Sequence, residues 1–326
     1  MLNRSVSIEP GLRAKIWGQR IGSCTWKISR FILLLGIQFV LIYPILYMVV
    51  TAFRGSADME DPSIVWLTQT WTLDNITSLI EAMNYPSLLS YTIQISLISA
   101  ILQTFMCGLI GYGFARFDFP FKNILFAVVI FTIIVPVQTY LSPLYMMFRF
   151  FRIPIASSVM DALAQGSGTF KLIDTPLPFW IQSLFGMGFR SGLFIFIFRQ
   201  FYRGMPAELE EAALIDGCGV SRTYFRVMLP NAKSSMITVF IFSLVWHWND
   251  YFVPSVFSET RQTIATSLAS LRSMLERMTS LNGGDQLMIQ VQVQAGALLA
   301  IAPMLILFVF AQRYFTEGIE RSGIVG

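Results

Sequence analysis

Residues 88–115 read Leu88-LSYTIQISLISAILQTFMCGLIGYGF-Ala115, and no charged side chain occurs anywhere in this stretch. A helix that crosses the roughly 30 Å hydrocarbon core of a bilayer needs about 20 mostly apolar residues, and this stretch is longer. An open strand in lipid would leave backbone N–H and C=O groups without partners, so the stretch is predicted to be a membrane-spanning helix. Its small residues suit close packing against other helices: Ser96, Ser99, Ala100, Gly108, Gly111 and Gly113.

Five further stretches of similar length and composition occur along the chain, and they are uncharged except for Arg190 and Asp250. The sequence therefore predicts an all-α polytopic membrane protein with six transmembrane helices. We divide the chain into an N-terminal segment at 1–30, a six-helix transmembrane domain at 31–314 and a C-terminal tail at 315–326. In chain order, the predicted spans are 31–53, 88–115, 124–148, 179–198, 235–257 and 288–312.

The composition of the whole chain agrees with membrane insertion. Of the 326 residues, 55% are apolar and 13% are charged, which is about half the charged share of a soluble domain. This excludes a soluble enzyme, a disordered regulator and a nucleic-acid-binding domain, so no nucleic-acid partner is expected. Cys24, Cys107 and Cys218 lie far apart without metal-ligand spacing, so neither a metal site nor a disulfide framework is predicted.

Lys and Arg are divided unevenly between the two sides of the predicted membrane domain. The termini and the loops after spans two and four carry 15 of them, and the opposite loops carry 7. Because cytoplasmic loops carry the excess of positive charge, both termini are predicted to be cytoplasmic. The segment at 12–30 is expected to lie on membrane lipid at the inner leaflet. The outer loops at 55–86 and 259–286 have room for short helices, and 153–178 is predicted to be irregular.

The loop between spans four and five, residues 204–230, is predicted to form two short helices. Pro206 is expected to set the first helical turn, and Gly217 to end that helix in a left-handed conformation. Ser221 is a candidate cap for the second helix, which Pro230 is expected to end. Three acidic residues stand where the helix dipole favours them, and the first two are expected to be solvated: Glu208, Glu210 and Glu211.

A helix of about ten residues is not stable alone, so the first of these helices needs a docking surface. Ala212 and Ala213 keep one side of it flat, which lets the groove of a partner approach closely. The spacing of the loop residues also matches a known motif, E-A-A-x3-G-x9-I-x-L-P, with valine in place of isoleucine. The matching residues are Glu211, Ala212, Ala213, Gly217, Val227, Leu229 and Pro230.

On this motif, the chain resembles the membrane subunits of binding-protein-dependent ABC importers, and the resemblance covers nearly the whole length. Trp248-Asn249-Asp250 in span five, and the ending Gln312-Arg313-Tyr314-Phe315-x-x-Gly318, are similar to the carbohydrate-uptake branch. Within that branch, the chain is most similar to the maltose-type second permease. The tail departs from the family, because many relatives carry a lysine near the penultimate position.

The resemblance implies a non-catalytic transport subunit in a bacterial or archaeal plasma membrane. Its implied partners are a homologous second permease, two cytoplasmic ATPase subunits and an external solute-binding protein that delivers a sugar. The seven motif residues are then implied to form a coupling loop that sits in an ATPase cleft. The chain itself lacks the phosphate-binding G-x-x-x-x-G-K-[ST] motif, so ATP and Mg²⁺ are expected in the partner ATPases and no cofactor in this chain.

His247, Trp248, Asn249 and Asp250 are candidates for the sugar path. An acid inside the membrane is functional by default, and tryptophan stacks on sugars while asparagine and aspartate bind hydroxyls. The alternative for this segment is a position near the outer interface, where tryptophans gather and Asp250 caps or pairs. His247 is equally compatible with a packing role. Arg190 is expected to extend toward the outer interface rather than into a cavity.

Three alternatives to a sugar importer differ in the residues that they require. An ABC importer permease for a non-sugar solute keeps the same loop. An ion-coupled secondary transporter would require buried ionisable residues and paired interrupted helices in two halves, and Asp250 is the single candidate of that kind. A membrane enzyme is disfavoured, because the chain has one histidine and three scattered cysteines.

Overall fold

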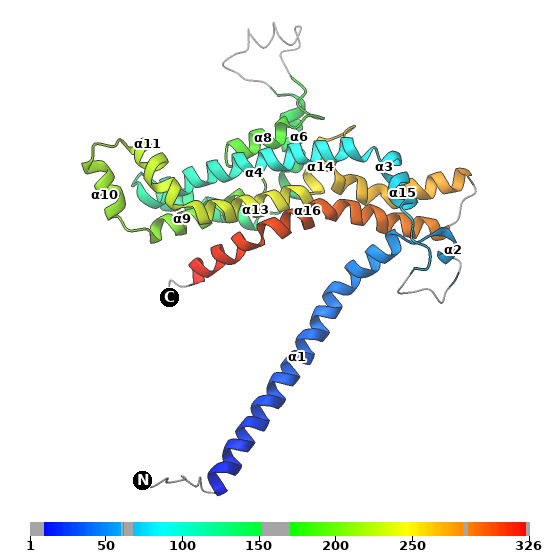
Figure 1. The fold of residues 1–326 in the computed structure, drawn as a ribbon. Helices are drawn as coiled ribbons and strands as arrows, with labels where there is room; N and C mark the ends of the chain where they lie inside the picture. Colours follow the sequence, from blue (N-terminus) through cyan, green and yellow to red (C-terminus); the bar gives the residue numbers. More distant parts are fainter. Residues whose placement is uncertain (1–9, 60, 62–67, 152–169, 283–285, 324–326) are drawn as a thin grey trace.

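The uncharged stretch at 88–115 lies within one continuous helix, α4 (Tyr85–Arg116), which is central to the bundle (Figure 1). It packs along α9 (Ser191–Gly204) and α13 (Lys233–Asn249), and it also contacts α8 (Leu177–Leu184). In the part of the chain that the structure describes there is no strand beyond isolated bridges, so the predicted all-α fold is confirmed. The computed structural model describes residues 10–59, 61, 68–151, 170–282 and 286–323.

Three helical segments in the described ranges are long and apolar enough to cross a membrane. They are Thr25–Ala52 within α1 (Pro10–Ala52), all of α4, and Leu287–Gln312 within α16 (Gln286–Gly323). Figure 1 shows α1 leaving the bundle and meeting it near the C-terminal end of α1, where α1 packs against α16. α1 runs through residue 30 without a break, so the predicted boundary between the N-terminal segment and the first span lies inside one helix.

The other three predicted spans are not single helices, and that prediction was wrong. The third is α5 (Lys122–Ile134) and α6 (Gln138–Arg149), whose axes differ by 103°. The fourth is divided between α8 and α9, and the fifth between α13 and α14 (Phe252–Phe257). Two bent pairs pass the same test together, α5 with α6 and residues Val220–Asn231 with α13 (77°), so the described residues hold three spans, or up to five if each of these pairs is one span. The number of six stays a prediction.

Each break has a local cause. Pro136 has no N–H and forces the preceding Val135 into an extended conformation, which ends α5. Between α8 and α9, Gly186 and Arg190 both have positive φ angles, 65° and 61°. After α13, Asp250 is extended, and its carboxylate accepts the first free N–H groups of α14 from Phe252 and Val253.

The far end of the bundle contains the short helices expected in the outer loops. They are α2 (Ser56–Met59), α3 (Asp74–Ala82) and α15 (Ile264–Asn282). The predicted irregular loop at 153–178 lies largely outside the described residues. Its described end pairs Phe170 with Phe151 and leads into α8.

An ion cluster around Glu259 connects α6 with the segments before α8 and α15. The Glu259 carboxylate accepts hydrogen bonds from Tyr145 Oη at 2.5 Å, Arg149 at 2.8 Å and Lys171 Nζ at 2.9 Å. The hydrogen bond from Tyr145, followed by that from Lys171, lowers the pKa of Glu259 to about 2. The folded state therefore favours the charged carboxylate.

Replacing Glu259 by glutamine is expected to lower the melting temperature at neutral pH. Because the folded pKa is depressed, the stabilisation is fully present above the ordinary pKa of 4.5 and is lost as the pH falls toward 2. The difference from the native chain should therefore shrink below pH 4.5, as measured by thermal unfolding of the detergent-solubilised chain. Glu276→Gln, on the exposed pair with Arg272, is the control. A difference that is constant with pH would contradict the prediction.

α4 and α9 approach each other closely at Gly111. A Cβ added there would lie 2.5 Å from Phe198 Cβ and 3.0 Å from the Arg199 backbone nitrogen, whereas Gly113 has nothing within 4 Å. Gly111→Ala is therefore expected to destabilise the fold by about 1–3 kcal/mol through overpacking. Gly113→Ala should be neutral or slightly stabilising, because alanine favours helix. Equal melting temperatures for the two variants would show that the helices have room to separate.

Candidate functional site

The coupling loop, residues 204–230, begins where α9 ends and forms α10 (Glu208–Ile215) at the end of the bundle opposite α15 (Figure 1). Ala207 is the N-cap of α10, so Pro206 precedes the helix and does not lie in its first turn as predicted. The three acidic residues do occupy that turn, as the sequence predicts: Glu208, Glu210 and Glu211.

Gly217 ends α10 in the left-handed conformation that the sequence predicts. Its φ angle is +80°, and its N–H donates to the Leu214 carbonyl at 3.0 Å. The next N–H, of Cys218, donates to the Ala213 carbonyl at 3.0 Å. These two bonds form a Schellman motif, which satisfies the last carbonyls of the helix. Gly217 thereby fixes the direction in which the chain leaves α10.

The second half of the loop is less regular than predicted. α11 (Val220–Thr223) passes into a π-helical turn at Tyr224–Met228 and then into α12 (Leu229–Asn231). Gly219 is the N-cap in place of Ser221, and Pro230 lies inside α12 instead of ending the helix before it. The π turn explains the second difference, because its wider ladder leaves room for a proline ring that has no N–H to donate.

The exposed side of the coupling loop carries large apolar side chains among charged ones. Glu211 and Ala212 lie on this exposed side, whereas Ala213 is buried and packs against the rest of the chain. The predicted flat surface for a partner therefore includes Ala212 but not Ala213. An exposed apolar surface on a short helix suits a partner's groove. The exposed large apolar side chains of the loop are Leu209, Leu214, Ile215 and Val220, whereas the half-exposed Phe225 stacks on Phe105 of α4.

Glu210 attaches α10 to the central helix α4. Its carboxylate accepts a hydrogen bond from Tyr112 Oη at 2.6 Å and lies 3.3 Å from Arg116 Nε. Arg116 also donates to the Met205 carbonyl at 2.8 Å, at the start of the loop. From the sequence, Glu210 was expected to be solvated, so its contact with α4 was not predicted. The sequence offered one indication of this contact: Arg116 directly follows span two, on the side of the membrane where the loop is also predicted to lie.

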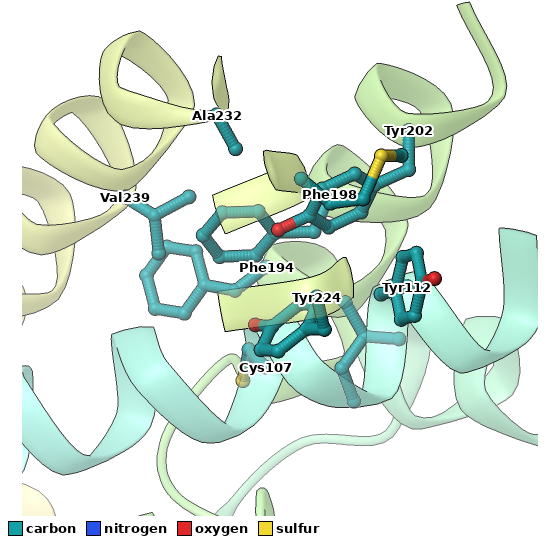
Figure 2. Packing of buried hydrophobic residues seen from close by; sticks show 10 residues of the cluster. Cys107, Tyr112, Phe194, Phe198, Tyr202, Tyr224, Ala232 and Val239 are labelled. Carbon is teal, nitrogen blue, oxygen red and sulfur yellow. The ribbon is translucent and has the colours of Figure 1, made fainter. Parts of the chain in front are cut away.

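An aromatic cluster under the loop joins it to three helices (Figure 2). Tyr112 of α4 lies between Tyr202 of α9 and Tyr224 of the π turn, with ring centres 5.4 and 4.9 Å away. All three rings are buried. Val227 and Leu229 of the motif pack against this cluster, whereas Pro230 is exposed. The loop is thus held to the membrane helices from below, with its exposed apolar side chains left open.

The four candidates in the fifth predicted span point in different directions. His247 is buried, and its Nε2 lies 3.1 Å from Gln103 Oε1. Trp248 Nε1 donates to the Ala300 carbonyl at 3.3 Å, so its ring packs toward α16. Asn249 is exposed and bonds to its own helix, and Asp250 caps α14. The structure thus brings His247 and Asp250 together but not Trp248 and Asn249, and a role of these residues in the sugar path stays a prediction.

The three helix breaks lie around one small cavity. Val137, Gly188 and Phe189 come from the first two breaks, and His247 and Asp250 from the third. The cavity volume is about 10 Å³, close to what one water molecule requires. Backbone without helix hydrogen bonds is tolerated at membrane depth where it is buried or lines a cavity. Transporters build substrate sites from broken helices of this kind.

A larger hollow of about 250 Å³ opens beside the same breaks. Arg190 lines it, with its guanidinium 4.9 Å from the Trp246 ring centre and 5.1 Å from that of Phe189. Arg190 thus stacks on rings of its own chain instead of extending along the interface as expected. No carboxylate within the described ranges forms an ion pair with it. Gln138 and Tyr140 add further polar groups to the hollow.

Relatives of this chain are transport permeases. The arabinooligosaccharides transport system permease protein AraQ of Halalkalibacterium halodurans is 26% identical over 295 residues, which cover 89% of this chain and 93% of the relative. The maltodextrin transport system permease protein MdxG of Bacillus subtilis is 26% identical and covers 92% and 96%. The lactose transport system permease protein LacG of Rhizobium radiobacter is 24% identical and covers 87% and 91%.

A solved structure shares the fold. It is the crystal structure of a bacterial ABC transporter involved in the import of the acidic polysaccharide alginate, with a TM-score of 0.67 and 19% identity over 90% of this chain and 98% of that chain. The family model described as "binding-protein-dependent transport system inner membrane component" matches residues 105–321. This match includes α4 from residue 105 onward, the coupling loop and the helix breaks. The chain belongs to this family of inner membrane transport components.

Proposed function

We propose that this chain is the membrane-spanning permease subunit of an ATP-driven importer for a sugar or oligosaccharide. The observation that carries the proposal is the coupling loop, which has the family motif, exposed apolar side chains and a firm attachment to α4. The relatives named for arabinooligosaccharides, maltodextrin and lactose support the class of substrate.

The proposed partners supply the ATP-binding and substrate-delivery functions that this chain lacks. It has no phosphate-binding loop motif, so two ATPase subunits bind ATP and Mg²⁺, and this chain is non-catalytic. A second permease completes the transport path, and an external solute-binding protein delivers the substrate. In the proposed topology of six crossings with both termini in the cytoplasm, the coupling loop lies on the ATPase side, which is the side predicted to carry 15 of the Lys and Arg residues against 7.

The proposed mechanism is a rigid movement of the bundle. When the ATPases close, they displace α10, and Glu210 passes the displacement to Tyr112 and Arg116 of α4. The aromatic cluster carries it to α9 and α13. Each nucleotide state binds one arrangement of the helices more tightly, and this difference drives the change in access.

The substrate path is proposed to run along the hollow that Arg190 lines. A polar hollow at membrane depth is unfavourable against lipid, so we assign this face to the second permease and the substrate. The stacked guanidinium keeps N–H donors for sugar oxygens, and Trp246 and Phe189 offer rings for a sugar face.

The test is a reconstitution. The full-length chain is tagged, solubilised gently and purified with its co-purifying subunits, which are then identified by mass and placed in vesicles. We expect ATP hydrolysis by the assembly but none by this chain alone, and uptake of labelled maltodextrin or arabinooligosaccharide that needs ATP inside the vesicle. Uptake that an ion gradient drives without ATP would favour a secondary transporter. Competition by non-sugar solutes alone would place the substrate in another class.

A further inference from the structure

A basic groove lies at the end of the bundle that carries the coupling loop. It has a volume of about 620 Å³ and lies between the end of α4, the start of α5 and the last turns of α9. Arg199, Arg203 and Lys122 line it together with one acid, Asp118, which pairs with Lys122 at 3.1 Å. The groove thus carries an excess of two positive charges.

Arg199 is held in place for binding within this groove. Its guanidinium lies 3.8 Å from the centre of the Phe126 ring, and its Nε donates to the Phe114 carbonyl at 3.4 Å. An arginine has five N–H donors, so those of its two terminal nitrogens stay available. Arg203 is exposed, and no acid within the described residues forms an ion pair with it. The groove therefore presents two guanidinium groups to an anion.

An apolar strip on α5 begins at the groove and runs along the bundle. Phe121 is 72% exposed at the edge of the groove, and Ile124, Val128 and Phe131 continue on one face at helical spacing. No residue of α5 is buried within the described chain. A free phosphate ion would use the guanidinium groups alone, whereas a phospholipid would use both the groove and the strip.

We infer that this groove binds the headgroup phosphate of an anionic phospholipid, whose acyl chains lie along the exposed face of α5. Arginine pairs with phosphate through two parallel hydrogen bonds, and basic pockets between membrane helices favour anionic headgroups. The bound lipid joins α4, α5 and α9 next to the start of the coupling loop. This inference concerns the lipid alone and does not depend on the substrate proposed above.

Native mass spectrometry of the detergent-solubilised, full-length chain tests the inference. Phosphatidylglycerol is expected to bind at lower concentration than phosphatidylcholine, and Arg203→Gln should weaken phosphatidylglycerol binding about fivefold. Because Arg203 is exposed, its replacement leaves folding intact, which an unchanged melting temperature will verify. Arg272→Gln, which removes an exposed charge at the opposite end of the bundle, is the matched control.

Two results would overturn the inference. Equal binding of the two lipids, or equal effects of Arg203→Gln and Arg272→Gln, would show that the groove does not select the headgroup. Displacement of phosphatidylglycerol by millimolar inorganic phosphate would identify a site for a free anion instead. Retention of phosphatidylglycerol in the presence of that phosphate supports a lipid site that uses the α5 strip as well.

Discussion

Replacing Gly217 by valine is expected to remove most ATP-driven uptake. At its φ angle of +80°, a β-branched residue is strained by about 1–3 kcal/mol, so the Schellman turn becomes roughly tenfold less populated or worse. The exposed side of α10 then loses its fixed direction relative to the rest of the loop. We expect the ATPase subunits to be lost during purification and uptake in vesicles to fall by at least about tenfold.

Gly219 provides a matched control two residues away. An added Cβ meets nothing within 4 Å at either glycine, so the two sites differ in backbone conformation and not in space. Gly219 has a φ angle of −71°, which any residue adopts, and Gly219→Val should therefore keep most of the uptake. Full retention of the ATPase subunits by Gly217→Val would show that the turn is not needed for docking.

Replacing Glu210 by alanine is expected to separate ATP hydrolysis from transport. The carboxylate lies between Tyr112 and Arg116, and the side chains of both Arg116 and Glu210 are largely buried. Its removal leaves the Tyr112 hydroxyl without its acceptor and the Arg116 guanidinium without its counter-ion, although Arg116 keeps its bond to the Met205 carbonyl, and we expect a cost of about 2 kcal/mol. Since the exposed side of α10 is unchanged, the ATPases should still dock, while α4 follows their movement less closely. We expect uptake per ATP hydrolysed to fall several-fold.

Glu208→Ala is the control for that experiment. Glu208 lies in the same first turn but is exposed, so its loss removes a similar charge without opening the contact to α4. The two variants are compared by measuring ATP hydrolysis and sugar uptake on the same vesicles. An equal ratio of uptake to hydrolysis in both would show that Glu210 acts only through the charge of the helix N-terminus.

The sequence predicted the long helices well, because an uncharged run of apolar residues has few alternatives in lipid. The sequence did not predict which of the spans would be divided into two helices at a proline. Pro44 and Pro303 lie inside continuous helices, whereas Pro136 ends α5. Each proline alone looks the same in the sequence, so the extended conformation of Val135 before Pro136 could not be predicted from the proline itself.

At the candidate site, Gly217 was predictable because a left-handed helix end requires glycine. Glu210 was not, since its partners Tyr112 and Arg116 lie about a hundred residues earlier and only the fold brings them together. The same holds for Arg190. Its stacking on Trp246 depends on two broken helices whose breaks the sequence did not reveal.

The pairing of α1 with α16 has a consequence for biosynthesis. α1 is made well before α16, which is its main contact among the described helices and lies more than two hundred residues later. Such a long-range contact forms slowly, because the intervening chain must be completed first. α1 therefore lacks this contact until α16 has been made, and a chain truncated before α16 leaves the contact surface of α1 unpaired, where quality-control proteases can recognise it.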